Sequence, residues 1–155
     1  MNVWKSVKWK ENIKEFSHRR GIRVRYEKNV DPNVKSAISN LLSRLKENYV
    51  FPTRLNVYVK GNKKVRASDG DIVYDFFFWT FNKYDEPYIT IATGDYLERA
   101  EKLGSDEALF VILFDLLTDI THYFQWLNGK DFYSKTLKRE ARACARSILN
   151  EFTSS

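Results

Sequence analysis

Four polar side chains recur along one otherwise apolar segment of the chain. Residues 107–127 are mostly apolar, and within them Asp115, Thr118, Asp119 and His122 fall at positions i, i+3, i+4 and i+7. On a helix this spacing places all four on one face. Carboxyl and imidazole groups can act as acids, bases and metal ligands, and burying them together is costly unless each has a partner or a shifted pKa. We therefore expect this helix to present the stripe to a cleft.

The sequence around the stripe resembles a known active-site helix. Residues 116–128 read LLTDITHYFQWLN, which is similar to the HELxHYxQW helix of small bacterial and phage zincin-type metallopeptidases of the minigluzincin or SprT-like kind. A weaker resemblance extends over about residues 50–151. The segment 87–93 is similar to the edge-strand region that these domains place beside the cleft, and residues 138–145 are similar to the helix that supplies a glutamate as third zinc ligand, here Glu140.

The two positions that carry most of the zinc-peptidase chemistry are changed. In HExxH, two histidines four residues apart bind zinc, and the glutamate polarises the metal-bound water. Thr118, whose neutral hydroxyl is a poor zinc ligand, stands at the first histidine position, and the shorter Asp119 stands at the general-base position. Only His122 and Glu140 match the ligand positions. The resemblance therefore implies a zincin-like domain without ordinary peptidase activity, acting as a binding or regulatory module.

The polar stripe has two further interpretations. In the first, Asp115 joins Asp119, His122 and Glu140 in an oxygen-rich site that binds a non-zinc divalent ion weakly, as in a divergent metal-dependent hydrolase. In the second, which we favour, no cofactor is bound, and Asp119 or Asp115 holds His122 in one tautomer through a hydrogen-bonded network.

Other nucleophile or ligand residues carry little signal. Cys144 is the only cysteine, so an internal disulfide is excluded, and it falls in an apolar helical pattern without an activating neighbour. His18 lies among Ser17, Arg19 and Arg20 and is expected at the surface.

Hydrophobic periodicity predicts the elements that position the stripe. Alternating patterns predict strands at 22–27, 55–59 and 88–92, and the aromatic run 72–81 either packs a sheet or lines the cleft wall. Helical patterns predict helices at 3–18, from Pro32 after an Asp31 cap, at 95–102, at 107–127 and at 136–151. This order predicts an α+β fold, a small mixed β-sheet packed on a central buried helix with additional helices. We expect residues 1–30 to form a basic helix and strand appended to a zincin-like domain at 31–155.

The charge of the chain is unevenly distributed. Residues 1–66 contain 17 Lys and Arg against 5 Asp and Glu, whereas the remainder is net acidic, giving +6 for the whole chain. The basic residues at the N-terminus surround Trp4, Trp9 and Phe16, a composition that can bind a nucleic-acid backbone and stack on bases. The alternative is that these aromatic residues dock the N-terminal helix onto the domain. A nucleic-acid-binding accessory protein is therefore the alternative to a module that binds an unknown protein or peptide.

The location of the protein is also an expectation from sequence. The N-terminus lacks the apolar block of a signal peptide, and the apolar run at 108–114 is too short to span a bilayer. We expect a cytoplasmic protein with no membrane partner.

Overall fold

The sheet of the protein has four strands and mixed polarity. The computed structural model describes residues 2–79, 81–82, 84–130 and 134–153, and only the backbone of residues 12–15. The strand order is β1-β2-β6-β5, in which β1, β2 and β6 are parallel and β5 runs antiparallel to β6. The strands are β1 (Ile22–Tyr26), β2 (Leu55–Lys60), β6 (Tyr88–Ala92) and β5 (Asp75–Phe78).

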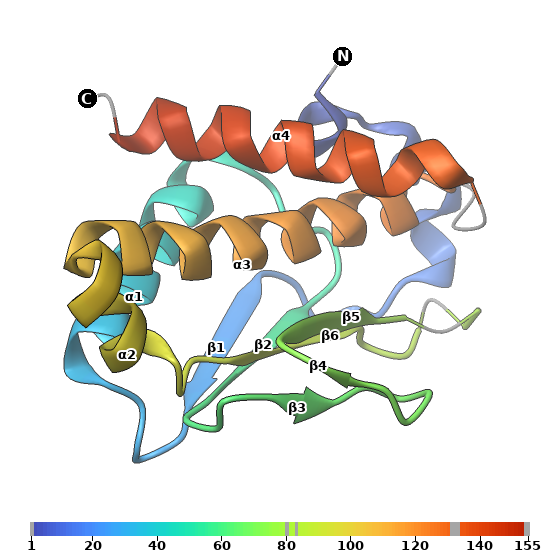
Figure 1. Cartoon of the computed structure of the whole chain (residues 1–155). Coiled ribbons are helices and arrows are strands. Elements are labelled where there is room, and N and C mark those ends of the chain that lie inside the picture. The colour runs from blue at the N-terminus through green and yellow to red at the C-terminus, as the bar shows by residue number, and fades with distance from the viewer. Residues whose placement is uncertain (1, 80, 83, 131–133, 154–155) are drawn as a thin grey trace.

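Alternation of side chains gives this sheet two different faces. Leu55, Val57 and Val59 of β2 are fully buried, whereas the residues between them are partly exposed. The buried face packs on the helices, because side chains along a strand point alternately to opposite sides. A short antiparallel pair, β3 (Val65–Arg66) and β4 (Ile72–Val73), lies on the other side of the sheet from α3 and α4 (Figure 1).

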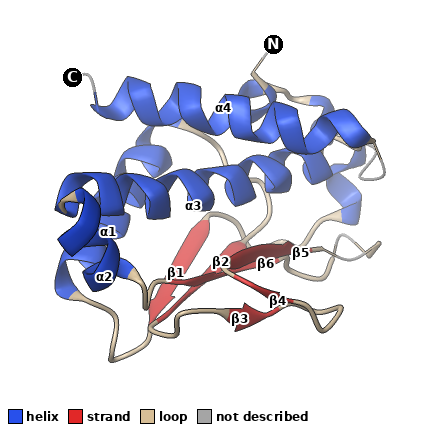
Figure 2. Ribbon diagram, viewed as in Figure 1, coloured by secondary structure: helices blue, strands red, loops and turns tan. Residues whose placement is uncertain are grey.

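Four α-helices occupy the inner side of the sheet. They are α1 (Pro32–Asn48), α2 (Tyr96–Leu103), α3 (Ser105–Leu127) and α4 (Lys135–Thr153), shown in blue in Figure 2. The last three agree with their predicted ranges to within two residues. The Asp31 side chain accepts the Asn33 N–H at 2.8 Å, which confirms the predicted N-cap of α1. The expected α+β fold, with a small mixed sheet packed on helices, is confirmed.

The helix that carries the polar stripe is the centre of the core. Leu116, Leu117, Ile120 and Tyr123 of α3 are fully buried, and burial of each such side chain contributes about 1.5–3 kcal/mol to folding. The Tyr123 hydroxyl donates to the Thr53 carbonyl at 2.5 Å, which fixes α3 against the segment that leads into β2. Rigid packing of this kind holds the stripe in a constant position.

The first thirty residues are part of the same core. Trp4, Trp9 and Phe16 are each at most 9% exposed, and the Trp4 indole N–H donates to the Thr121 hydroxyl of α3 at 2.9 Å. β1 is hydrogen-bonded to β2 along its whole length. The expected division at residue 30 therefore does not correspond to a packing boundary, and these three rings are not available to stack on bases.

The predicted helix at 3–18 is wrong in its form. The segment forms two 3-10 helices, Val3–Lys5 and Lys8–Glu15, separated at Ser6, whose backbone is extended. The break allows Trp4 and Trp9 to reach the core from separate short turns. A continuous α-helix would present its apolar side chains on a single face. Here the contacts that the two tryptophans make with the core determine the backbone conformation instead.

Candidate functional site

An open cleft of about 440 Å³ lies between α3, α4 and residues 72–75. We call it the α3 cleft. Its polar side chains come from three elements: Asp115, Thr118, Asp119 and His122 of α3, Asp75 of β5, and Lys138 and Arg142 of α4. The structure thus brings the four residues of the predicted stripe to one cleft, as their spacing suggested. Carboxyl groups line one part of the cleft, and the α4 wall is cationic.

Asp119 is a buried carboxyl group beside the partly exposed Asp75. Asp119 is 4% exposed, and its Oδ2 has no hydrogen-bond donor among the described residues. Burial first, and then the hydrogen bond and negative charge of Asp75, raise the pKa of Asp119 well above its usual value. Two carboxylates cannot donate to each other, so a hydrogen bond between Asp75 and Asp119 requires one of them to be protonated. The surroundings of the general-base position thus favour the neutral, protonated form of Asp119.

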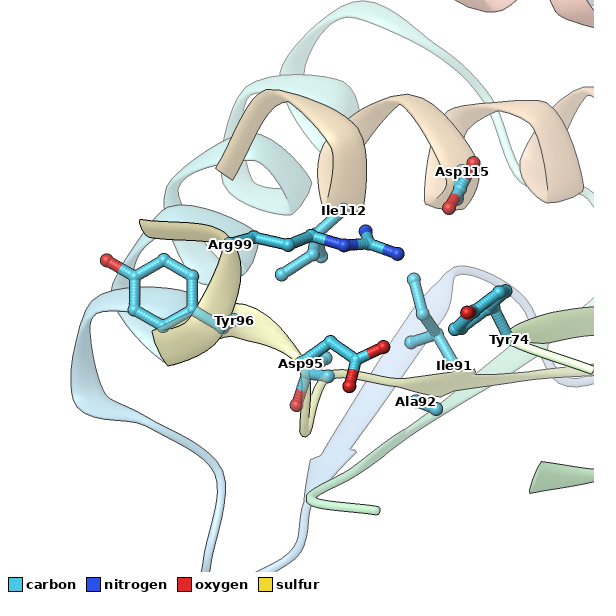
Figure 3. Close-up of a pocket in the computed structure, with 9 residues that line it drawn as sticks. Tyr74, Ile91, Ala92, Asp95, Tyr96, Arg99, Ile112 and Asp115 are labelled. Atoms are coloured by element: carbon cyan, nitrogen blue, oxygen red, sulfur yellow. The ribbon is translucent and has the colours of Figure 1, made fainter. Parts of the chain in front are cut away.

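Asp115 lies one helical turn before Asp119 and is partly shielded from solvent. Burial and the negative charge of Asp75 raise its pKa to about 6, while Arg99 and Arg142 act in the opposite direction. Asp115 also borders a second, smaller pocket between α2, α3 and the end of β6. Figure 3 shows Arg99 of α2 extending across this pocket toward Asp115, with Tyr74 on the other side. The two hollows are thus joined at Asp115.

His122 is hydrogen-bonded to Gln125, three residues later in α3. Its Nδ1 lies 2.8 Å from Gln125 Oε1, and Gln125 Nε2 donates to the Leu137 carbonyl at 3.1 Å. The second bond fixes which end of the amide faces the ring, so Nδ1 carries the proton and donates to Oε1. Burial lowers the pKa of His122, and the nearby positive charge of Lys138 acts in the same direction. The bond to Gln125 was not among the expected contacts of His122, and the network with Asp119 or Asp115 as its partner stays a prediction.

The hydroxyl of Thr118 is not directed toward a metal position beside His122. Its hydroxyl donates to the carbonyl of Phe114, one turn earlier in the same helix, at 2.9 Å. That bond is the ordinary way in which a threonine inside a helix satisfies its hydroxyl. The first ligand position of the motif is thus engaged within α3.

Glu140 is not brought to the α3 cleft. It is exposed on α4, whereas Lys138 and Arg142 line the cleft on that helix. Within the part of the chain that the structure describes, no group of three or more His, Cys, Asp or Glu side chains is arranged to hold a metal ion. The expected donor set of Asp119, His122 and Glu140, with Asp115 as a substitute, does not fit a metal in this arrangement. The α4 wall adds two positive charges where a cation would need negative ones.

Sequence reasoning missed Asp75, Lys138 and Arg142 as cleft residues. Asp75 belongs to β5, which is the edge strand of the sheet, whereas the segment 87–93 expected at the edge forms the interior strand β6. A carboxylate on the inward-facing side of an aromatic strand is the signal that could have identified Asp75. The i, i+4 spacing of Lys138 and Arg142 similarly places them on one flank of α4.

The remaining candidate residues lie apart from the cleft. His18 is exposed, as expected. Cys144 is half-buried on α4, its thiol lies 3.4 Å from Asn2 Oδ1, and burial raises its pKa, so it is a packed thiol. In the aromatic run, Phe77 packs in the core against Trp126, whereas Phe76 and Phe78 point to the other face of the sheet.

Among the helices of the described residues, none combines the length and apolar composition that crossing a membrane requires. No protein-family model matches this chain, and neither a curated protein nor a solved structure shows significant similarity to it.

Proposed function

We propose that this chain is a metallopeptidase-like domain without catalytic activity, which uses the α3 cleft to bind a partner or ligand. The observation that carries the proposal is the α4 wall, where Lys138 and Arg142 line the cleft. In the family that the motif resembles, a glutamate on the corresponding helix is the third zinc ligand. The ammonium of Lys138 and the guanidinium of Arg142 instead place positive charge opposite the carboxyl groups of the cleft.

The two altered motif positions support the same proposal. The Thr118 hydroxyl donates to the Phe114 carbonyl within the helix, and burial beside Asp75 raises the pKa of Asp119, which favours its protonated form. A protonated carboxyl group cannot accept a proton from an attacking water. Even an ionised aspartate would hold its oxygens short of the position of a glutamate, and a misplacement of about 1 Å can cost on the order of 100-fold in rate.

The charges of the cleft indicate what it would bind. Asp75 and Asp115 lie at one wall, and Lys138 and Arg142 lie at the other. A polar segment that carries both a cationic and an anionic group would pair with both walls, as a peptide with mixed charges does. Such pairs contribute specificity and orientation more than affinity.

Metal content and peptide hydrolysis test the proposal together. The full chain, purified without chelators, should contain substoichiometric zinc and manganese by elemental analysis, and it should not cleave unfolded protein or peptide substrates after incubation with either ion. The matched control for His122→Ala is His18→Ala, which changes an exposed histidine. Stoichiometric metal that is lost in His122→Ala and kept in His18→Ala would overturn the proposal and indicate a divergent metal-dependent hydrolase.

A further inference from the structure

The outer face of the sheet, opposite the helices, carries a cluster of aromatic side chains. We call Tyr58, Phe76, Phe78 and Tyr88 the aromatic face. Tyr88 is at its centre, with ring centroids at 4.9 Å from Phe78, 5.8 Å from Tyr58 and 5.9 Å from Phe76. All four are partly exposed. Aromatic rings that are only partly covered on a sheet offer flat surfaces to a planar partner.

Strand register places basic side chains directly beside these rings. Arg25 of β1 is paired with Tyr58 of β2, which is in turn paired with Thr90, and Thr90 with Phe76. In the neighbouring row, Arg23 lies two strands from Tyr88, a distance of about 10 Å at the usual spacing between strands. Both arginines are exposed on β1, an edge strand. The cations thus lie along one border of the aromatic face.

A trough extends the basic surface across the aromatic face. An open hollow of about 430 Å³ lies between the β3 segment and the sheet, lined by Lys60, Lys64 and Arg66 together with Phe76 and Tyr88. Glu27 is the acidic residue among those that line this trough, and Lys60 lies 3.8 Å from it. The trough therefore has an excess of two positive charges, and its floor is aromatic.

We propose that the aromatic face and its basic borders bind single-stranded nucleic acid. Unpaired bases stack on aromatic rings without strong sequence preference, and lysines and arginines along the groove pair with the phosphates. The arrangement favours a strand over a duplex, since paired bases keep their flat faces inside the helix. The proposal is independent of the α3 cleft, which lies on the other side of the sheet, and it transfers the expected nucleic-acid contact from Trp4, Trp9 and Phe16 to exposed rings.

Fluorescence anisotropy of the full chain tests the proposal with labelled oligothymidine and oligouridine strands of about 15 nucleotides. We expect binding to at least one of them that weakens steeply between about 50 and 200 mM salt, with an unlabelled duplex as a poor competitor. The strand that binds more tightly indicates whether the natural ligand is DNA or RNA. A duplex that competes as well as the strand, or absence of binding to both strands, overturns the proposal.

Two variants assign the binding to this face. Arg23→Gln with Arg25→Gln should reduce the slope of log affinity against log salt by about 1.4, at roughly 0.7 per lost phosphate contact. Tyr88→Leu should weaken binding by about tenfold with little change in that slope, the loss expected for one base–aromatic stack. The control, Lys46→Gln with Arg139→Gln, removes the same charge from exposed positions of α1 and α4. Equal effects of the control and the Arg23/Arg25 variant would contradict the assignment, and these exposed substitutions test it even if Tyr88→Leu does not fold.

Discussion

Asp119, in the middle of the buried helix α3, lies beside Asp75, at the start of β5, and burial together with this carboxyl neighbour raises the pKa of Asp119 well above its usual value. The pair joins the sheet to the helix at the place where the sequence motif expects a general base. The raised pKa favours the protonated form of Asp119, and protonation removes one of the two negative charges, so that a buried aspartate is tolerated here.

Replacing Asp119 with asparagine should stabilise the protein at alkaline pH. The raised pKa of Asp119 means that the folded state keeps a proton which the unfolded chain has released, so stability falls as pH rises from the unfolded pKa to the folded one. Asparagine keeps the shape, needs no proton and can donate to Asp75. We expect Asp119→Asn to gain about 1–3 kcal/mol at pH 8 in urea unfolding, the cost of one unsatisfied buried group. Asp69→Asn, an exposed change, is the control. A variant that is less stable than the parent at pH 8 would contradict the raised pKa of Asp119.

Asp115 should make a separate contribution between about pH 4 and pH 6. Its pKa is raised from 3.8 to about 6, so the folded state binds the proton more tightly, and stability is lost as pH rises through this window and is constant above it. After allowance for solvent screening of a partly exposed group, the loss should be about 1–2 kcal/mol. Asp115→Asn should abolish it, as measured by urea unfolding at several pH values. Parallel stability profiles for the parent and the variant would show that Asp115 titrates normally.

Gln125 should be required for the position of His122. Gln125→Ala removes the hydrogen bonds that Gln125 makes with His122 Nδ1 and with the Leu137 carbonyl, and each loss costs about 1–3 kcal/mol in a buried site. We expect a loss of stability in this range and a change of the His122 tautomer in nitrogen-detected NMR. Asn150→Ala, at an exposed position of α4, is the control and should change neither property. An unchanged tautomer in Gln125→Ala would mean that another group orients the ring.

Trp4 should contribute to the stability of the whole domain. Trp4→Ala removes a large buried side chain and its bond to Thr121, and such truncations cost about 3–5 kcal/mol. Val7→Ala, at a position 56% exposed, should cost little. Denaturant unfolding followed by tryptophan fluorescence and circular dichroism should give one coincident transition that shifts as a unit in Trp4→Ala. Two separate transitions in the parent protein would instead indicate that residues 1–30 are an appended unit.

The elements of the fold were largely predictable, because long periodic segments decide them. The apolar α3 and the capped α1 are strong signals, and the alternation in β2 is clear. The N-terminal helix was not predictable, since Trp4 and Trp9 obtain their conformation from contacts with α3 and its neighbours. Hydrophobic periodicity indicates which residues share a helix face. It does not indicate which residues, more than a hundred positions away, that face contacts.

The cleft was half predictable for a related reason. The stripe on α3 follows from spacing within one helix, so the four residues could be placed together. The buried line of α4, Leu137, Ala141, Ala145 and Ile148, leaves Lys138 and Arg142 on one flank and Glu140 on the other. The sequence does not indicate which flank faces α3, because that depends on how the two helices pack. Asp75 was missed for the same reason, because its position beside Asp119 depends on the pairing of β5 with β6.

Carbon-detected NMR of the side-chain carboxyl groups, recorded at pH 7 before and after one equivalent of Zn²⁺, tests directly whether a neutral Asp119 and a cationic α4 wall stand where a zinc peptidase would hold its metal ion. We expect Asp119 to be protonated at pH 7 and the His122 ring signals to stay unchanged when zinc is added. An ionised Asp119, together with a stoichiometric shift of the His122 signals on zinc addition, would contradict this expectation.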